Sequence, residues 1–456
     1  MTAHHNILGL IGRTPLVELR GVDAGLCRVF VKLENQNPGG SIKDRIGRSM
    51  IEAAEREGKL APGATLVEAT AGNTGLGLAL VAAQKGYRLI LVIPDKMSQE
   101  KIHHLKALGA EVVVTRSDVG KGHPAYYQDM AAKIAAETPG AFYVDQFNNP
   151  ANPLAHETTT GPEIWGQMNG RLDAVVVGVG SGGTLTGLSR FFAKVAPHVE
   201  MVLADPVGSI LADVVETGAH GEAGSWLVEG IGEDFIPSIA DLSRVRRAYR
   251  IPDSESLNTA RDLLRTEGIL AGSSSGTLVA AALRYCKEQK TPKRVATLIV
   301  DSGNKYLSKM YNDVWMADQG FRRTGAYGDL RDLIVRRMAD GAVVSVSPDE
   351  PLSQVYRRMR LYDVSQLPVL SGKQVVGIVD ESDVLDAVNR EPGAFRRPVS
   401  DYMTTRLETV SPRATLDDLR PILDAGKVAI VADHDGFHGL ITRMDVLNHL
   451  RRQTAA

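Results

Sequence analysis

Runs of β-branched residues alternate with alanine-rich stretches over the larger, N-terminal part of the chain, from about residue 6 to residue 318. The clearest apolar runs are residues 89–93, 111–114, 174–177 and 201–204. Because these runs are continuous rather than alternating, they predict parallel strands that are buried on both faces. Residues 98–108 have a helical pattern that stops at Gly109, a residue type that commonly ends helices. Repeated strand–helix–strand units predict an open α/β sheet whose ligands bind at loops after the carboxyl ends of strands.

The C-terminal part of the chain contains an internal repeat. The tripeptide VSP at residues 346–348 recurs at 410–412, and residues 377–385 have a counterpart at 439–447. Each copy combines a Ser-Pro turn, a helical stretch, a pair of strands and a final helix, which predicts an α+β unit. A single copy of roughly 60 residues is small for a stable domain, so we expect the two copies to pack together. The predicted parts are a first domain at 1–318, a linker at 319–332, a first copy at 333–392 and a second copy at 393–456.

Composition argues against several classes of function. The 456 residues carry 52 Lys and Arg against 54 Asp and Glu, a net charge of −2, which gives no electrostatic footprint for binding nucleic acid. Only two cysteines occur, Cys27 and Cys286, so we expect neither a disulfide framework nor a metal site. The first residues lack a signal-peptide core, and no apolar run reaches roughly 18–20 residues. We therefore expect a cytoplasmic protein with no membrane partner.

One lysine stands where a predicted strand gives way to a helix. The strand-like run at 29–33 is followed by NPGGSIKDR at residues 37–45, which places Lys43 in the first turn of the next helix. The positive end of the helix dipole favours loss of the proton from its ammonium. A neutral lysine amine is the group that an aldehyde cofactor needs to form a Schiff base. A lone lysine is usually a solvated surface residue, so this interpretation depends on other loops.

Three further loops have small residues at a strand-to-helix connection or a turn. Residues 68–75 (EATAGNTG) would bring backbone N–H groups close to an anion such as a carboxylate, with Asn73 as a neutral donor. Residues 177–184 (VGVGSGGT) place successive N–H groups and hydroxyls at a helix N-terminus, which is typical of a phosphate cradle. This loop lacks the Gly-Lys-Ser/Thr ending of a Walker loop. Residues 271–277 (AGSSSGT) form a serine-rich turn, a type that is mostly solvated.

Together the four loops resemble those of the fold-type II pyridoxal phosphate (PLP) enzymes, in the branch that contains cystathionine β-synthase and cysteine synthase. The resemblance covers essentially all of residues 6–318, with the motifs in the family's order and spacing. Residues 229–232 (EGIG), continued by FIP at 235–237, are more similar to cystathionine β-synthase than to cysteine synthase. The resemblance implies an α/β fold of the tryptophan synthase β type, with open twisted sheets.

The resemblance also implies a role for individual residues. Lys43 would form the Schiff base with PLP and move protons at the substrate Cα. Asn73 would donate to the cofactor's ring hydroxyl, and Ser274 would face the pyridine nitrogen, where a hydroxyl favours β-elimination and β-replacement over transamination. The residues implied to hold the phosphate are Gly180, Ser181, Gly182, Gly183 and Thr184. Those implied to hold the substrate are Thr70, Ala71, Gly72, Asn73, Thr74, Gln146 and Gly230.

The implied reaction is a β-replacement that condenses L-serine or O-acetylserine with L-homocysteine to L-cystathionine, with release of hydrogen sulfide from cysteine as a second activity. Ala71 stands where many relatives carry serine, and Phe147 and Glu233 stand where the animal enzymes carry tyrosine. These departures leave the choice between serine and O-acetylserine open. The alternative within the family is a cysteine synthase that uses O-acetylserine and sulfide. The haem-binding N-terminal segment of the animal enzymes has no counterpart here, so we expect PLP and no haem.

The C-terminal repeat resembles a pair of CBS domains, a module that often binds adenosyl compounds. In that family a Thr/Ser-x-x-Asp motif presents its aspartate to ribose hydroxyls. The second copy has Thr442 and Asp445, whereas the first has Asp380 in place of the threonine ahead of Asp383. We therefore expect one competent site, for S-adenosylmethionine or a nucleotide. The alternative is a ligand-free module that assists assembly into the homodimer or higher homo-oligomer that the resemblance implies.

An alternative of another class makes the chain a metabolite sensor, in which the CBS pair is functional and the PLP domain is vestigial. A vestigial site should have lost some of the residues that hold the cofactor. The presence of Lys43, the glycine-rich phosphate cradle and Ser274 argues against this alternative.

Overall fold

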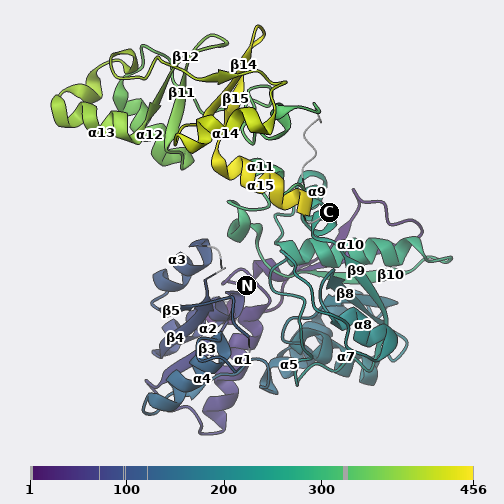
Figure 1. Cartoon of the computed structure of the whole chain (residues 1–456). Coiled ribbons are helices and arrows are strands. Elements are labelled where there is room, and N and C mark those ends of the chain that lie inside the picture. Colours follow the sequence, from purple (N-terminus) through teal and green to yellow (C-terminus); the bar gives the residue numbers. More distant parts are fainter. Residues whose placement is uncertain are drawn as a thin grey trace. The chain divides into compact units, whose positions relative to one another are not determined.

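The computed structural model describes residues 4–454 except 71, 96, 98, 121 and 322–326. The chain forms two compact units, Met1–Tyr311 and Asn312–Ala456, each with its own sheets and helices (Figure 1). This division falls a few residues before the expected end of the first domain. The limits given above for the linker and the two repeat copies stay predictions. Among the described residues, no helix is long and apolar enough to cross a membrane.

The larger sheet of the first unit has six strands in the order β1-β2-β10-β7-β8-β9. Its strands are Leu16–Leu19 (β1), Arg28–Leu33 (β2), Ala174–Gly178 (β7), Glu200–Pro206 (β8), Val245–Ile251 (β9) and Arg294–Ile299 (β10). All neighbours pair in parallel except β1 and β2. The predicted runs at 174–177 and 201–204 are buried in the middle of this sheet, as expected for strands covered on both faces.

The smaller sheet of the first unit has four parallel strands in the order β5-β4-β3-β6. Its strands are Thr65–Ala69 (β3), Arg88–Pro94 (β4), Glu111–Thr115 (β5) and Phe142–Tyr143 (β6). The run at 111–114 was predicted to be buried on both faces, but it forms the edge strand β5, and Val114 is 52% exposed. The predicted helix between β4 and β5 is present as α3, Gln99–Ala107. Gly109 follows it with a φ of +86°, a conformation that glycine adopts without strain.

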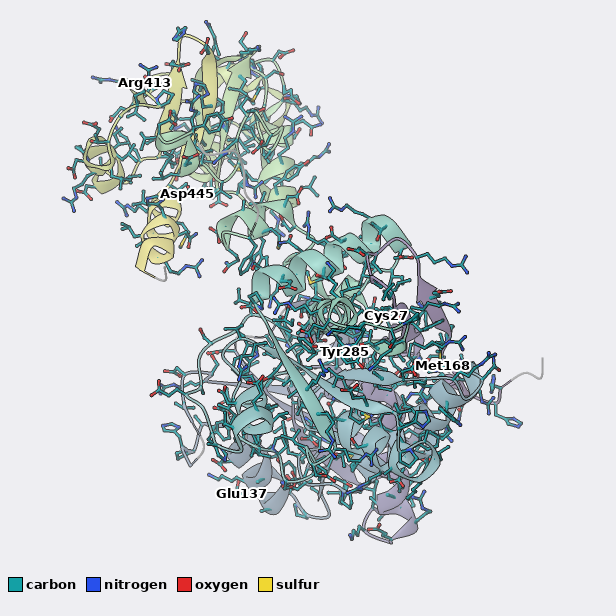
Figure 2. All side chains as sticks on the ribbon, turned by 90° about the vertical axis from the view of Figure 1, so that its right-hand side faces the viewer. Cys27, Glu137, Met168, Tyr285, Arg413 and Asp445 are labelled. Atoms are coloured by element: carbon teal, nitrogen blue, oxygen red, sulfur yellow. The ribbon has the colours of Figure 1, made fainter. Side chains whose placement is uncertain are left out.

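Helices surround both sheets, and side chains fill the space between them (Figures 1 and 2). Besides α3, the helices of the first unit are Lys43–Arg56 (α1), Asn73–Lys85 (α2), Tyr127–Glu137 (α4), Ala151–Ala155 (α5), Gly161–Gln167 (α6), Gly183–Val195 (α7), Leu211–Thr217 (α8), Asp253–Glu267 (α9) and Ser273–Lys287 (α10). Helices α1, α2 and α7 follow β2, β3 and β7 along the chain. Their N-termini therefore lie beyond the carboxyl ends of parallel strands, where ligands bind in this class of fold.

Helices α1 and α2 cross with their backbones in contact. A Cβ added to Gly47 would stand 2.8 Å from the carbonyl carbon of Gly77, and one added to Gly77 would stand 2.6 Å from the carbonyl oxygen of Lys43. Because only glycine allows so close an approach, the two glycines set the distance between the helices. The crossing fixes the first turn of α1, which carries Lys43, against α2.

The starts of two helices differ from the sequence-based expectations. Helix α2 begins at Asn73, inside the segment 68–75 that was expected to be a loop, so Asn73 lies in its first turn. The serine-rich segment is not a solvated turn, because Ser273, Ser274 and Ser275 form the buried first turn of α10. Their hydroxyls can be buried because the protein supplies partners: the Ser275 Oγ accepts a hydrogen bond of 2.9 Å from the Val300 N–H.

The second unit confirms the predicted repeat, with a helix, a strand pair and a helix in each copy. The first copy contains Leu352–Tyr362 (α12), Gln366–Ser371 (β11), Gln374–Asp380 (β12) and Glu381–Arg390 (α13). The second contains Thr409–Val410 (β13), Leu416–Asp424 (α14), Ala429–Asp433 (β14), Gly436–Ile441 (β15) and Arg443–Thr454 (α15), and Asp313–Asp318 (α11) precedes both. Leu330, in the predicted linker, and Leu333 and Ile334, at the start of the first copy, pack into the core of the second. That contact joins the two copies into one α+β unit.

Candidate active site

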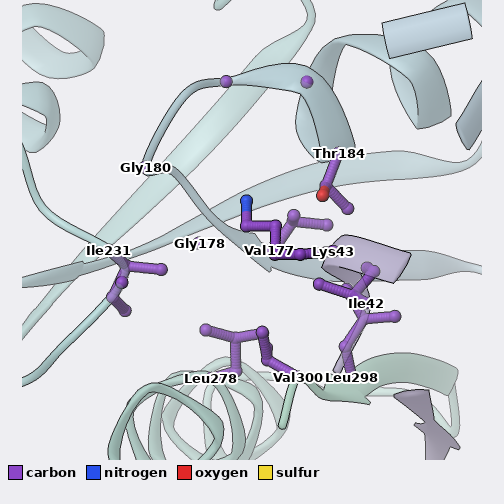
Figure 3. Close-up of a pocket in the computed structure, with 13 residues that line it drawn as sticks. Ile42, Lys43, Val177, Gly178, Gly180, Thr184, Ile231, Leu278, Leu298 and Val300 are labelled. Atoms are coloured by element: carbon purple, nitrogen blue, oxygen red, sulfur yellow. The ribbon is translucent and has the colours of Figure 1, made fainter. Parts of the chain in front are cut away.

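Lys43, the first residue of α1, lines a cavity in the first unit (Figure 3). Figure 3 shows its Nζ pointing into the space between Ile231 and the loop that carries Gly180. The other residues of the predicted site that line this cavity are Gly180, Gly182, Gly183, Thr184 and Gly230. The structure therefore brings together the lysine, the glycine-rich loop and the EGIG segment, which lie far apart in the sequence.

The amine of Lys43 loses its proton more readily than that of an ordinary lysine. Burial lowers the pKa of Lys43 to about 8, although the carboxylates of Glu233 and Asp301 act in the opposite direction. The direction agrees with the expectation from the helix dipole, but removal from water is the larger cause. With this pKa, about a tenth of Lys43 is neutral at pH 7, compared with less than about a thousandth for a free lysine.

The glycine-rich loop after β7 leaves no room for side chains. A Cβ on Gly180 would stand 2.6 Å from the Gly230 carbonyl oxygen, and one on Gly183 would overlap the Asn152 side chain. Gly182 precedes α7 with a φ of +88°, and no side chain caps the first N–H groups of this helix. A helix N-terminus of this kind binds anions, because uncapped N–H groups and the helix dipole both favour negative charge.

Two hydroxyls of this loop are held by residues that the sequence analysis did not assign to the site. The Ser181 Oγ accepts a hydrogen bond of 2.9 Å from Asn152 Nδ2. The Thr184 Oγ1 lies 3.2 Å from Nε2 of His156, which is fully buried. Burial, with the charges of Arg45 and Lys43, holds the pKa of His156 well below its usual value. His156 is therefore neutral, and it orients Thr184 without adding charge to the cradle.

The loop after β3 is tied to the segment that follows β6. Thr74 Oγ1 donates a hydrogen bond of 2.6 Å to the Gln146 Oε1, and Gly72 N donates one of 3.2 Å to Thr70 Oγ1. The structure thus places Thr70, Gly72, Thr74 and Gln146 together, as the family resemblance implies for a carboxylate site. Ala71 lies outside the described residues.

The buried carboxyl group of Glu68 connects this loop to the segment that carries Gln146. Its two oxygens accept hydrogen bonds from the backbone N–H groups of Ala69, at 2.8 Å, and Gln146, at 3.1 Å. Burial raises the pKa of Glu68 to about 8, against the effect of these hydrogen bonds. Glu68 is therefore mostly uncharged at neutral pH, which limits its repulsion of a carboxylate bound to the loop above it.

The EGIG segment is held against the same loop by an ion pair. Lys101, on α3, is buried and hydrogen-bonds to Glu229, which also accepts a hydrogen bond of 2.7 Å from Lys309. A Cβ on Gly72 would stand 2.7 Å from Cδ of Lys101. Lys101 therefore packs against the loop after β3, at Gly72, and keeps Glu229, and with it Gly230, beside the cavity.

Asn73 and Ser274 lie in the first turns of two helices. The Asn73 amide hydrogen-bonds to Asp301 Oδ2 and to Lys305 Nζ, both at 2.8 Å. Ser274 is buried and stands four residues before Leu278, which lines the cavity. Residues four apart on a helix share a face, so Ser274 lies on the face of α10 that borders the cavity.

These donors fit PLP. The cradle that a Cβ would fill, with its uncapped N–H groups, suits the phosphate, and Lys43 in the same cavity suits the aldehyde. Asn73 and Ser274, to which the resemblance gives the ring oxygen and the ring nitrogen, lie in the first turns of α2 and α10. The roles of these residues toward the cofactor remain proposals.

Comparison with known proteins gives the family. Residues 7–301 match the family described as pyridoxal-phosphate dependent enzyme, and residues 331–390 and 399–452 match the CBS domain. Cystathionine β-synthase of Apis mellifera is 34% identical over 459 residues, an alignment that covers 98% of this chain and 91% of that protein. This chain belongs to the cystathionine β-synthase family. As a member of this family it is a PLP-dependent enzyme, which sets aside the hypothesis of a sensor with a vestigial PLP domain.

Two solved structures share the fold of its first unit. An O-acetylserine dependent cystathionine β-synthase from Helicobacter pylori gives a TM-score of 0.63 at 35% identity, covering 68% of this chain and 99% of that chain. A hydrogen sulfide-producing enzyme from Fusobacterium nucleatum gives a TM-score of 0.63 at 34% identity, covering 67% of this chain and 100% of that chain. Together with the family match and the curated relatives, they support PLP-dependent β-replacement as the type of reaction.

Polar residues that surround the predicted loops received no role in the site from the sequence analysis. They are Glu68, Lys101, Asn152, His156, Glu229, Asp301, Lys305, Tyr306 and Lys309. One signal was available, because DSGNKY at 301–306 directly follows the apolar run of β10. The rule that ligands bind after the carboxyl ends of parallel strands would have included this segment in the site.

Proposed function

We propose that this member of the cystathionine β-synthase family condenses L-serine or O-acetylserine with L-homocysteine to give L-cystathionine. The observation that carries the proposal is the shared cavity of Lys43, the uncapped N-terminus of α7 and Gly230. The similarity to cystathionine β-synthases over nearly the full chain supports it. The O-acetylserine dependent structure from Helicobacter pylori is the reason to keep both first substrates.

In this proposal the residues of the chain bind the substrates and move protons. Bound PLP supplies an electron sink that stabilises negative charge at the substrate Cα. The N-terminus of α7 and Thr184 hold its phosphate, and the loop at 70–74 with Gln146 holds the carboxylate of the first amino acid. Lys43 takes the proton from Cα and later returns one there. The bond between Cβ and oxygen breaks, the oxygen leaves as water or acetate, and the thiolate of homocysteine forms the new bond to Cβ.

The same groups serve a second candidate function. With sulfide as the nucleophile and O-acetylserine as the first substrate, the product is cysteine, and cysteine as the first substrate releases hydrogen sulfide. The hydrogen sulfide-producing enzyme from Fusobacterium nucleatum supports including this chemistry in the test.

Initial rates decide between these candidates. We expect fast formation of cystathionine, identified by mass, when homocysteine is supplied with serine or with O-acetylserine. The rate with sulfide, measured under the same conditions, should be lower. Turnover of O-acetylserine with sulfide alone, and none with homocysteine, would contradict the proposal and favour the cysteine synthase. If only O-acetylserine reacts with homocysteine, Ala71→Ser becomes the first variant to test for a gain of serine turnover.

We also propose that the CBS pair binds an adenosyl compound in its second copy. Thr442 donates hydrogen bonds from its backbone N–H and its hydroxyl to Asp445 Oδ2, both at 2.6 Å. Figure 2 labels Asp445 on α15. In the first copy the Asp380 N–H donates to Asp383 Oδ2 at 3.0 Å, and the Asp383 N–H donates to Asp380 Oδ1 at 2.9 Å. The Asp445 N–H likewise donates to Thr442 Oγ1, at 3.3 Å. The geometry of the two copies is thus alike, but Asp380 adds a negative charge where Thr442 is neutral.

Calorimetric titration with S-adenosylmethionine and with ATP tests this site. We expect one binding event per chain, abolished by Asp445→Ala, because the carboxylate is the acceptor for the ribose hydroxyls. Asp383→Ala is the matched control and should leave the heat unchanged. Two equal binding sites per chain, or an unchanged heat of binding in Asp445→Ala, would contradict the proposal. If neither ligand gives any heat of binding, the ligand-free module is favoured.

A further inference from the structure

A second buried lysine links two loops of the active site. Lys305 lies in a 3₁₀ helix, Gly303–Tyr306, that follows β10, and it is only 7% exposed. Its Nζ donates hydrogen bonds to the carbonyl oxygens of Gly39 and Gly40, both at 3.2 Å, and to Asn73 Oδ1 at 2.8 Å. The three acceptors belong to the loop that precedes Lys43 and to the first turn of α2. One ammonium group therefore holds the lysine loop and the asparagine together.

The partners of Asn73 fix which way its amide points. Its Oδ1 faces the Lys305 ammonium, and its Nδ2 donates a hydrogen bond of 2.8 Å to Asp301 Oδ2. The reverse orientation would place N–H bonds against the ammonium and an oxygen against the carboxylate, which is unfavourable on both sides. Asp301 is itself fixed, because Tyr306 donates a hydrogen bond of 2.7 Å to the same oxygen.

We propose that Lys305 and Asp301 are positioning residues that hold the Asn73 amide with its NH2 group toward the ring oxygen of the cofactor. An amide NH2 carries two N–H bonds, and Asp301 takes one of them. The Lys305 cation polarises the amide through Oδ1, and a polarised amide is a stronger donor to an oxyanion. The comparisons assign no role to either residue.

The burial of Lys305 argues against a role in stability alone, because moving a charge out of water is energetically unfavourable. Removal from water lowers the pKa of Lys305 to about 8, with a smaller contribution in the same direction from Lys101, while Asp301 and Asp44 act in the opposite direction. A buried charge of this kind adds little to stability compared with a well-packed apolar residue. Its three acceptors all belong to segments that carry Lys43 or Asn73. This placement favours a role in arranging the site.

Cofactor affinity of the apo-protein, measured by absorbance titration with PLP, tests the proposal. We expect Lys305→Met to weaken the affinity about 10- to 100-fold and to shift the absorption maximum of the bound cofactor, because Asn73 loses its orientation. Lys305→Arg should restore part of the affinity, since it keeps a cation and donors. The matched control is Lys85→Met, which removes a partly buried lysine bonded to Glu55 at the far end of α2 and should change the affinity less than twofold.

A double-mutant cycle distinguishes positioning of Asn73 from general support. If Lys305 acts through Asn73, Lys305→Met should weaken the affinity for PLP less than twofold in an Asn73→Ala background. The proposal would be overturned if Lys305→Met weakened PLP affinity as much in the Asn73→Ala background as in the wild type. It would also be overturned if Lys305→Met left the affinity and the spectrum unchanged. If Lys305→Met does not fold, as shown by circular dichroism, Asp301→Asn takes its place in the cycle. The same two outcomes then decide, because Asp301 holds the other side of the same amide.

Discussion

Lys43→Ala is expected to reduce the rate of β-replacement by at least about 10⁴-fold, the upper range for removal of a proton-transfer group. The variant loses both the amine that links to the cofactor and the base at the substrate Cα. Its purified form should bind PLP without the absorption band of a lysine Schiff base. Initial rates and absorbance spectra of the same preparation measure both effects. A variant that keeps the band would show that another amine carries the cofactor.

The pKa of Lys43 gives this prediction a pH dependence. The neutral amine is the reactive form, so the rate at which the apo-enzyme captures PLP should rise with pH and level off above about pH 8.

Loss of activity in Lys43→Ala should not come from unfolding. The pKa of the folded state lies below the usual 10.5, so the buried ammonium destabilises the folded protein. This cost is complete below about pH 8 and fades toward pH 10.5. The apo-variant should accordingly unfold at no lower temperature than the wild type at pH 7.

Arg45→Met is expected to lower the free energy of unfolding of the first unit by about 3–5 kcal/mol, because it breaks a buried ion pair by removing one partner. The Arg45 guanidinium, on α1, donates to both oxygens of Glu34, at 2.7 and 2.8 Å, and to both oxygens of Glu163, at 2.8 Å. Glu34 is fully buried and Glu163 also pairs with Lys32 at 2.7 Å. Methionine would leave the Glu34 carboxylate buried and without its cation.

Urea denaturation followed by tryptophan fluorescence measures the loss. The control is Arg88→Met, which removes an ion pair with Glu111 whose side chains are 58% and 52% exposed and should cost less than about 1 kcal/mol. Equal effects of the two substitutions would contradict the prediction. Burial raises the pKa of Glu163, but Arg45, with smaller contributions from Lys32 and the Arg13 N–H, outweighs burial and lowers the pKa to about 2. The stability from this carboxylate is therefore present above its ordinary pKa of 4.5 and is lost as the pH falls toward 2.

The sequence by itself determined the class of fold, the repeat and the principal loops of the site. Continuous apolar runs at 174–177 and 201–204 identified buried parallel strands, because a strand covered on both faces has no polar alternation. The loops at 37–45 and 177–184 show their local chemistry in consecutive residues, although the role of Lys43 could be inferred only from the loops taken together. Each contains its own glycines, donors and helix N-terminus in consecutive residues, so its local chemistry does not depend on distant parts of the chain.

Only the tertiary structure decided which distant groups act on these loops. Lys305 and Asn73 are 232 residues apart, and Asp301 and Asn73 are 228 apart. A contact of this kind leaves no periodic pattern, and a buried lysine looks like any polar position in the sequence. The burial of the serine-rich turn has the same origin, since its partner Val300 comes from after β10. The lowered pKa of Lys43 also depends on tertiary structure, because the surrounding cavity, and not the helix alone, removes water from its amine.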